Sequence, residues 1–463
     1  MRRETSGEMA PLATLSAEPL PASDWAASRM DKFVIEGGFP LSGTIVPAGN
    51  KNAALPALAA SLLTEEEVVL RNIPRIRDVE AMLGLLRAMG VRAEWRDENV
   101  VALCAADVTA EAVLDPELSS LIRASFLCAG PLLGRFGRAE APNPGGDVIG
   151  RRRLDPHLDA FRALGATVEY DRSGYNISAP RGLRACDFFM DEPSVMGTEN
   201  ALMAAALTPG SSVIHNAASE PHVQDLARLL LQMGARIEGI GSNVLIVHGQ
   251  DRLGGADYTI GPDYIEIGSF VALAAVTGGE LRIKDTIPDD LRMTKLGFER
   301  LGCRMDFDGS DVVVPGDQKL RIRDDAGDAV SKIEDGPWPA FPADLTSIAL
   351  ALATQSEGMV LIFEKMFENR LFFVDKLVTM GARVILCDPH RAVVSGPSRL
   401  HGERMESPDI RAGMAMLIAA LCAEGESEIG NIRQIDRGYE RIDERLRSLG
   451  ARIERVAAER VPA

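Results

Sequence analysis

The chain has 463 residues, of which 46% are hydrophobic and 25% are charged, and its formal net charge at pH 7 is -17. This composition is typical of a globular protein with two or three domains, and the acidic charge disfavours nonspecific binding to nucleic acid or to anionic membranes. The six cysteines form no CxxC pair and the six histidines form no ligand pattern, which argues against a zinc site and a disulfide framework. We therefore expect free thiols and a cytoplasmic location.

The N-terminal segment contains no continuous apolar stretch and does not resemble a secretory signal. No apolar run elsewhere is long enough to span a bilayer. We expect residues 1–29 to form a disordered tail, and Met30, which precedes the strand-like segment "DKFVIEGG", is an alternative start of translation.

One phrase recurs six times along the chain, as in "LLRAMGVRAEW" and "AFRALGATVEY". Each copy predicts the end of an amphipathic helix at a glycine, followed by an alternating strand. The glycines are Gly90, Gly165, Gly234, Gly302, Gly381 and Gly450. Upstream of the phrase lies a helix rich in small residues, as in "ENALMAAAL", and such an apolar helix is expected to be buried. Six units of strand, helix, strand, helix, strand and strand are expected to form two groups of three, with helices inside and sheets outside.

Three short motifs place cations at helix starts. In "GNKNAALP", Lys51 and Asn52 stand at the beginning of an apolar helix, where backbone N–H groups attract anions, although a capped, solvated helix start is equally compatible. Arg123 in "SSLIRASFLCAGPLL" and Arg411 in "SPDIRAGMAMLIAAL" each interrupt an apolar helix. A buried guanidinium is costly unless it is paired, so either could form a structural salt bridge. Their equivalent places in two repeats favour anion binding.

Two acidic residues stand beside further cations. Asp147 follows two glycines in "PNPGGDVIGRRRLDPH", which is either a solvated turn or a mobile acid that contacts a bound anion. The three arginines that follow, together with Arg370 in "FENRLF", indicate binding of small, multiply charged phosphates. Asp344 in "WPAFPADL" is either a helix N-cap or a general base on a rigid scaffold. The chain has no GxGxxG, GxxxxGK[ST] or GxSxG motif, which disfavours NAD, P-loop and serine hydrolase chemistry.

Together with "PSVMGTENALMAA", "DIRAG" and "IDRGYERIDERLRSLGARIERV", these motifs resemble the enolpyruvyl transferases over essentially the whole chain from Met30. The resemblance implies an α/β fold with two inside-out α/β barrel domains, each made of three repeated βαβαββ units around a cleft that closes on substrate. One domain would be 51–261, carrying the Asp147 loop, and the other 30–50 plus 262–463. The start "GNKN" in place of "GSKS", and the lack of "GNAGT", disfavour the branch that acts on shikimate 3-phosphate.

The resemblance implies transfer of the enolpyruvyl group of phosphoenolpyruvate to the 3'-hydroxyl of UDP-N-acetylglucosamine, the first committed step of peptidoglycan synthesis. It would proceed by addition and elimination through a tetrahedral ketal, without a metal or organic cofactor. The residues expected to be catalytic are Asp147 as the acid, Asp344 as the base, and Lys51 and Arg411. The residues expected to bind substrate are Asn52, Arg123, Arg152, Asp155, Pro156, His157, Ser194, Val195, Met196, Met366 and Arg370.

The position of Asp147 is a cysteine in most of the family, where it is the target of fosfomycin, and aspartate is a known alternative. A carboxylate is not the soft nucleophile that opens the epoxide, so we expect fosfomycin not to inactivate this enzyme. Arg153, Met196 and Tyr264 depart from the family pattern on the nucleotide-sugar side. They leave open a different acceptor, and a non-catalytic paralogue that senses UDP-N-acetylglucosamine is a further alternative.

Overall fold

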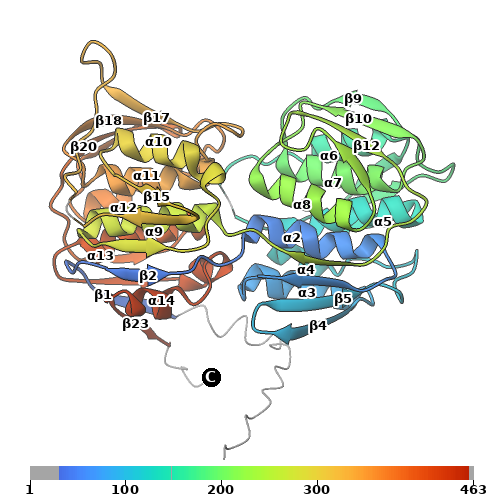
Figure 1. Ribbon diagram of the computed structural model, residues 1–463, viewed down its shortest axis with the longest axis horizontal. Helices are drawn as coiled ribbons and strands as arrows, with labels where there is room; N and C mark the ends of the chain where they lie inside the picture. Colours follow the sequence, from blue (N-terminus) through green and yellow to red (C-terminus); the bar gives the residue numbers. More distant parts are fainter. Residues whose placement is uncertain (1–30, 148, 317, 458–463) are drawn as a thin grey trace, which may run out of the picture.

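The computed structural model describes residues 31–147, 149–316 and 318–457. The expected N-terminal tail therefore lies outside the described residues. The chain forms two lobes that stand side by side (Figure 1). None of the helices in the described ranges is both long enough and apolar enough to cross a membrane.

The first lobe is built from three small sheets in the strand orders β13-β3-β5-β4, β6-β8-β7 and β11-β12-β10-β9. Its strands are β3 (Val68–Arg71), β4 (Arg92–Asp97), β5 (Val100–Cys104), β6 (Arg138–Pro142), β7 (Thr167–Asp171), β8 (Gly174–Ser178), β9 (Asp187–Phe189), β10 (Ser211–His215), β11 (Arg236–Glu238), β12 (Val244–His248) and β13 (Ala256–Thr259). Its helices are α2 (Lys51–Ala60), η2 (Ser61–Leu63), α3 (Arg77–Ala88), α4 (Pro116–Leu121), η3 (Arg123–Cys128), α5 (Ala129–Phe136), α6 (Asp155–Ala163), α7 (Val195–Ala206) and α8 (Pro221–Gln232).

The second lobe repeats this arrangement with the strand orders β15-β16-β14-β2, β17-β18-β20-β19 and β21-β22-β1-β23. Its strands are β1 (Lys32–Glu36), β2 (Gly43–Ile45), β14 (Leu281–Ile283), β15 (Asp306–Asp308), β16 (Asp311–Val314), β17 (Ser331–Glu334), β18 (Gly358–Phe363), β19 (Val384–Asp388), β20 (Arg391–Gly396), β21 (Arg404–Glu406), β22 (Glu426–Gly430) and β23 (Arg452–Val456). Its helices are α9 (Tyr264–Thr277), η4 (Pro288–Leu291), α10 (Arg292–Arg300), η5 (Ala343–Leu345), α11 (Thr346–Ala353), α12 (Val374–Thr379), α13 (Ile410–Cys422), η6 (Ile432–Arg437) and α14 (Ile442–Ser448).

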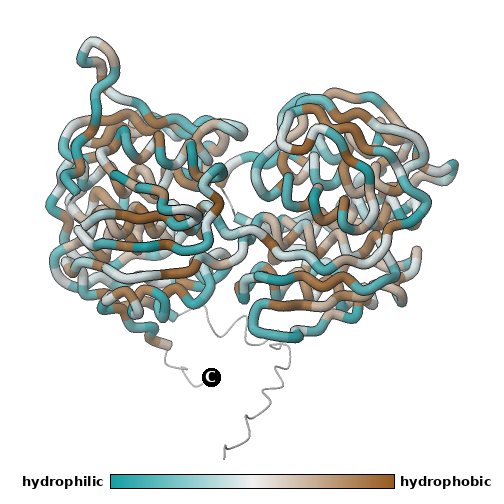
Figure 2. The backbone as a smooth tube through the Cα atoms, viewed as in Figure 1, coloured by the Kyte–Doolittle hydropathy of each residue, from teal (hydrophilic) through white to brown (hydrophobic). Residues whose placement is uncertain are grey.

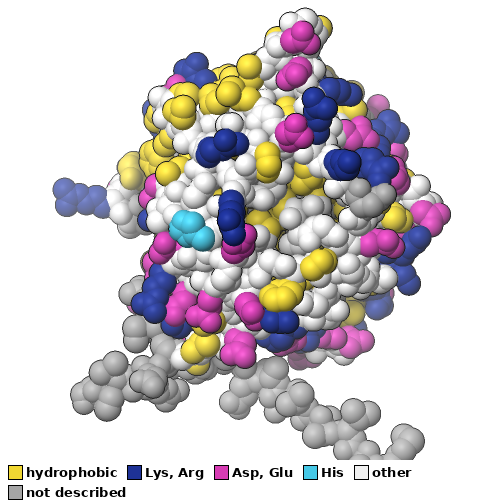
Figure 3. Space-filling model, turned by 90° about the vertical axis from the view of Figure 1, so that its left-hand side faces the viewer, with side chains coloured by type: hydrophobic (Ala, Val, Ile, Leu, Met, Phe, Trp, Pro, Cys, Tyr) yellow, Lys and Arg dark blue, Asp and Glu magenta, His cyan; other side chains and the backbone are white. Residues whose placement is uncertain are grey.

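Each lobe has its own hydrophobic core. One cluster of buried side chains comes from residues 53–260, and the other from residues 33–45 and 264–453. The small-residue helices α9, α11 and α13 are buried over nearly their whole length, as the apolar sequence predicts. Hydrophobic segments run through the interior of both lobes (Figure 2), while charged side chains of both signs are scattered over the outer face of the second lobe with hydrophobic side chains among them (Figure 3). The predicted arrangement of inner helices and outer sheets is confirmed.

The six repeat glycines occupy equivalent positions. Each follows an outer helix and has a φ between +82° and +102°, in the left-handed region that a side chain disfavours. The helices that end before them are α3, α6, α8, α10, α12 and α14. A strand begins within a few residues of each glycine, so the recurring phrase does mark a helix end followed by a strand.

The prediction of an uninterrupted helix around Arg123 is wrong, because the helix is broken just before this residue. Ile122 is extended, with φ -137° and ψ 142°, and a 3₁₀ helix begins at Arg123. The carbonyl of Ser119, which a continuous helix would bond to the N–H of Arg123, instead accepts bonds from Gly145 N at 3.1 Å and Ser125 Oγ at 3.1 Å. The glycine loop that precedes Asp147 therefore docks into the break.

The chain passes between the lobes twice, and the two passages run side by side. Asn50 N donates to Gly261 O at 2.8 Å, and Asp263 N donates to Ala48 O at 2.9 Å. α2 and α9 begin directly after these passages. The first residues of both helices consequently face the space between the lobes.

Candidate active site

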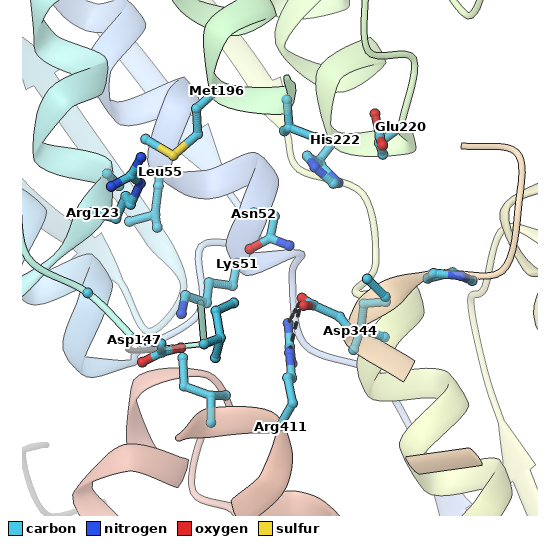
Figure 4. Close-up of a pocket in the computed structure, with 18 of the residues that line it drawn as sticks. Lys51, Asn52, Leu55, Arg123, Asp147, Met196, Glu220, His222, Asp344 and Arg411 are labelled. Atoms are coloured by element: carbon cyan, nitrogen blue, oxygen red, sulfur yellow. Dashed lines mark hydrogen bonds and ion pairs between the residues drawn. The ribbon is translucent and has the colours of Figure 1, made fainter. Parts of the chain in front are cut away.

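A cavity of about 250 Å³ lies between the lobes and is lined by side chains from both (Figure 4). Its cations are Lys51, Arg123, Arg152, Arg370, Arg411 and Arg437, and its carboxyl groups are Asp78, Asp147, Glu199, Glu220 and Asp344. Of the remaining predicted site residues, Asn52, Val195, Met196 and Met366 also line it. A cleft with this many cations in an acidic protein favours an anionic ligand.

Lys51 is the first residue of α2 and is nearly fully buried, which excludes a solvated helix start. Asn50 caps the helix by accepting bonds from the backbone N–H groups of Asn52 and Ala53. Lys51 Nζ pairs with Asp78 at 2.7 Å, and Asp78 also accepts from Arg437 Nε at 2.8 Å. Burial alone would raise the pKa of Asp78, but Lys51 and Arg437 more than offset this and lower it. Asp78 therefore joins a cation of each lobe through one buried carboxylate.

Asp147 is the last member of this chain of ion pairs. It pairs with Arg437, whose other partner is Asp78. Arg437 belongs to η6 of the second lobe, so the acidic loop of the first lobe is held across the cleft. The pairing answers the question raised by the sequence, because Asp147 faces the cleft and is not in a solvated turn (Figure 4).

The segment after Asp147 is anchored on both sides of the cleft. Asn369 N donates to Ile149 O at 3.0 Å, and Arg151 N donates to Glu368 Oε2 at 3.1 Å. On the other side, Arg123 Nη2 donates to the carbonyls of Arg152 and Arg153, at 2.8 and 3.0 Å. The loop in this structure is therefore closed against the second lobe.

Asp344 is fixed by two arginines. Arg370 Nη2 lies 2.9 Å from Oδ1, and Arg411 Nη2 lies 3.0 Å from Oδ2. Its side chain caps no helix in the structure, because α11 follows η5 without a side-chain cap. Burial would raise the pKa of Asp344, yet Arg411 and Arg370 hold it well below its usual range. The carboxylate is thus ionised and rigidly oriented at the cleft.

Arg123 and Arg152 are the cations left for a ligand. Within the described ranges, no carboxylate lies at ion-pair distance from either guanidinium. Burial, followed by the charge of Arg152, lowers the pKa of Arg123 to about 10. Burial also lowers the pKa of Arg152. Two partly desolvated guanidinium groups without an ion-pair partner in the described ranges are suited to a phosphate or carboxylate.

Four predicted substrate residues do not line the cavity, namely Asp155, Pro156, His157 and Ser194. His157 is buried, with Nδ1 2.8 Å from Asn200 Nδ2, and its burial lowers its pKa to about 3. Asp155 pairs with Arg153 at 3.1 Å. Ser194 caps α7 by accepting from Gly197 N at 3.2 Å. Their expected roles at the uridine and diphosphate stay predictions.

The departures from the family pattern divide into two groups. Met196 and Tyr264 line the cavity, whereas Arg153 turns away from it and pairs with Asp155 and Asp191. Tyr264 is buried, and its ring stacks on His222 with the centroids 6.3 Å apart. Two of the three departures are therefore in contact with the space that a ligand would occupy.

Several residues that were not predicted from the sequence also line the cavity: Asp78, Glu199, Glu220, His222, Trp338 and Arg437. Arg437 lies in "IDRGYE", part of one of the motifs that resemble the enolpyruvyl transferases, so the sequence could have indicated it as a site residue. Asp78 is an acidic residue in the first turn of a helix, a common feature that carries no functional signal of its own.

The two-lobed fold and the cation-rich cleft between its lobes define an enolpyruvyl transferase. The enolpyruvyl transferase NikO from Streptomyces tendae superposes with a TM-score of 0.81 over 93% of this chain and 100% of that chain, at 24% identity. EPSP synthase from Acinetobacter baumannii superposes with a TM-score of 0.69 over 92% of this chain and 100% of that chain, at 17% identity. These likenesses concern the fold.

The chain belongs to the EPSP synthase (3-phosphoshikimate 1-carboxyvinyltransferase) family, whose model matches residues 35–446. It is 58% identical to the UDP-N-acetylglucosamine 1-carboxyvinyltransferase of Bradyrhizobium diazoefficiens, over 92% of this chain and 98% of that protein. It is 54% identical to the protein of the same name from Treponema denticola, over 92% of this chain and 99% of that protein.

Proposed function

We propose that this enzyme transfers the enolpyruvyl group of phosphoenolpyruvate to the 3'-hydroxyl of UDP-N-acetylglucosamine and releases phosphate. The observation that carries the proposal is 58% identity to a UDP-N-acetylglucosamine 1-carboxyvinyltransferase along nearly the full length of both chains. The reaction is the first committed step of peptidoglycan synthesis. A cytoplasmic location, where both substrates are made, belongs to the same proposal.

The proposed mechanism has two steps. In the addition, Asp147, having left Arg437 and taken up a proton from solvent, protonates the methylene carbon of phosphoenolpyruvate. The 3'-hydroxyl oxygen attacks C2 and loses its proton to Asp344, which gives a tetrahedral ketal. In the elimination, a proton of the new methyl group returns to Asp147, the C2–O bond to phosphate breaks, and the phosphate leaves with the proton held by Asp344, which restores the double bond and both carboxyl groups. Both carboxyl groups face the cavity (Figure 4), in agreement with these roles.

The cations have complementary roles in the proposal. Arg123 and Arg152, which lack a carboxylate partner within the described ranges, would bind the phosphate and carboxylate of phosphoenolpyruvate or the diphosphate of the acceptor. Lys51 and Arg411, already oriented by Asp78 and Asp344, would stabilise charge on the ketal phosphate and carboxylate. Arg370 would act by orienting Asp344.

The domain division that fits this mechanism is 51–261 against 30–50 plus 262–463. Its support is that the two hydrophobic cores separate near these positions and that the paired passages at Asn50 and Asp263 connect them. Movement about these passages would open the cleft and withdraw Asp147 from Arg437.

The test is phosphate release from phosphoenolpyruvate, with and without UDP-N-acetylglucosamine, with the product mass recorded. We expect release to depend on the acceptor and the product to gain a carboxyvinyl group. Asp344→Asn should abolish release, whereas Asp375→Asn, on the surface of α12, should retain it. If the folded wild-type enzyme released no phosphate in the presence of this acceptor, the proposal would be contradicted.

A second candidate is enolpyruvyl transfer to a different nucleotide or sugar acceptor. The specific observation in its favour is that Met196 and Tyr264, two departures from the family pattern, line the cavity. A panel of nucleotide sugars in the same phosphate-release assay separates the two candidates. Preference for another acceptor by tenfold or more in kcat/KM would favour the second.

A further inference from the structure

The cavity has two chemically different sides. Lys51, Arg123 and the Asp147 loop lie on one side, Glu220 with His222 lies on the other, and Arg411 with Asp344 lies below Glu220 and His222 (Figure 4). Glu199 lines the cavity one turn after Met196 on α7, and Glu220 precedes the first turn of α8. Glu199 and Glu220 together are called the carboxyl corner below.

The carboxyl corner contains unsatisfied hydrogen-bonding atoms. Glu199 is buried, at 1% exposure, and within the described ranges neither its Oε1 nor Oε2 of Glu220 has a hydrogen-bond partner. The other oxygen of Glu220 accepts a long bond, 3.4 Å, from Trp338 N. Buried polar atoms are almost always hydrogen-bonded, so two orphan oxygens in one cavity indicate positions where a ligand supplies the partners.

The charge of the corner points to neutral donors. Burial, followed by repulsion from Glu220, raises the pKa of Glu199 well above its usual value, and burial also raises the pKa of Glu220. Two neighbouring side chains are uncharged, because burial lowers the pKa of His222 to about 4 and raises that of Tyr264. Anionic groups are attracted to the opposite side of the cavity, whereas hydroxyl and amide N–H groups find acceptor oxygens in the corner.

We infer that Glu199 and Glu220 bind hydroxyl or acetamide N–H donors on the sugar ring of the acceptor, and thereby orient and select it. The inference rests on the proposed function for the identity of that acceptor. With its phosphates on the cationic side and its donor-rich ring against the carboxyl corner, the acceptor spans the cavity. Asp344, which lies below Glu220 and His222 (Figure 4), then faces a ring hydroxyl.

The test measures affinity for UDP-N-acetylglucosamine by calorimetry and acceptor KM by turnover. Glu199→Met and Glu220→Met remove the acceptor oxygens at similar size, and each should weaken acceptor binding about tenfold, as expected for one or two lost hydrogen bonds. Glu199→Gln and Glu220→Gln retain a carbonyl oxygen and should stay within about threefold. The KM for phosphoenolpyruvate at saturating acceptor should change little, and Glu238→Met, on exposed β11, is the control.

A merely structural role is excluded with acceptor analogues. UDP-glucose lacks the acetamide, and 4-deoxy and 6-deoxy analogues lack single hydroxyls. If Glu199 or Glu220 binds one of these groups, the wild-type enzyme should bind the analogue that lacks it more weakly than UDP-N-acetylglucosamine. The Met variant of that glutamate should bind both compounds equally. Met variants that bind acceptor as tightly as wild type, or that keep the full discrimination, would overturn the inference. Absence of turnover in the wild type would instead count against the proposed reaction, while calorimetry still decides the inference.

Discussion

Asp78→Asn is predicted to impair the enzyme selectively toward phosphoenolpyruvate. The amide keeps the shape of the side chain but removes the charge that orients Lys51 and Arg437. Asp78 is nearly fully buried, and the side chains of Lys51 and Arg437 are 8% and 15% exposed. Lys51 would therefore lose its ion-pair partner, and Arg437 would keep only Asp147, in a place where water replaces the lost charge poorly.

The size of the expected loss in activity follows from the burial of Asp78, Lys51 and Arg437. Removing one partner of a buried ion pair costs about 3 kcal/mol, because an uncompensated charge remains. If the transition state loses this much binding free energy, kcat/KM for phosphoenolpyruvate falls about a hundredfold. The acceptor side of the cavity is not touched, so KM for UDP-N-acetylglucosamine should change by less than about threefold.

The assay is initial-rate phosphate release with each substrate varied at saturation of the other, together with thermal unfolding. Asp257→Asn is the matched control, because Asp257 pairs with Arg71 in the same lobe at 55% and 48% exposure, where a pair contributes little. A folded Asp78→Asn variant with kcat/KM for phosphoenolpyruvate within threefold of wild type would refute the role of Asp78 as a positioning residue. An equal loss in both substrates' KM would refute the selectivity.

Three further predictions concern the loop, a turn and pH. Fosfomycin should not inactivate the wild-type enzyme, whereas Asp147→Cys should become sensitive with one covalent adduct; time-dependent inactivation with mass added at Asp147 would contradict this. Gly234→Ala should destabilise the fold by about 1 kcal/mol in urea unfolding, because Gly234 has φ +100° with open space around it, so strain is the only cost; an unchanged midpoint would contradict it. Burial lowers the pKa of His222 to about 4, below the ordinary value of about 6.5, so the unfolded state binds the extra proton and stability falls as pH drops from about 6.5 toward 4. His222→Gln should remove up to about 3 kcal/mol of that pH dependence; equal slopes in the wild type and the variant would show that His222 is not the titrating group.

The repeat architecture was predictable from the sequence because its signals are local. The period of apolar residues marks a helix, and a glycine such as Gly234 or Gly450 ends it wherever the backbone needs a positive φ. Motifs such as "GNKN" also place Lys51 at a helix start from adjacent residues alone. The interruption at Ile122 was not predictable, because it depends on Gly145, which reaches the Ser119 carbonyl only after folding.

The sequence by itself determined the inner and outer helices, the recurring turns and a set of residues suited to anions and proton transfer. Only the tertiary structure decided which charges are paired and which are left for substrate. Asp78 and Arg437 lie 359 residues apart and belong to different lobes, yet they share one buried contact. Burial and countercharge set the behaviour of an ionisable group, and both depend on the path of the whole chain and not on the neighbours of a residue in sequence.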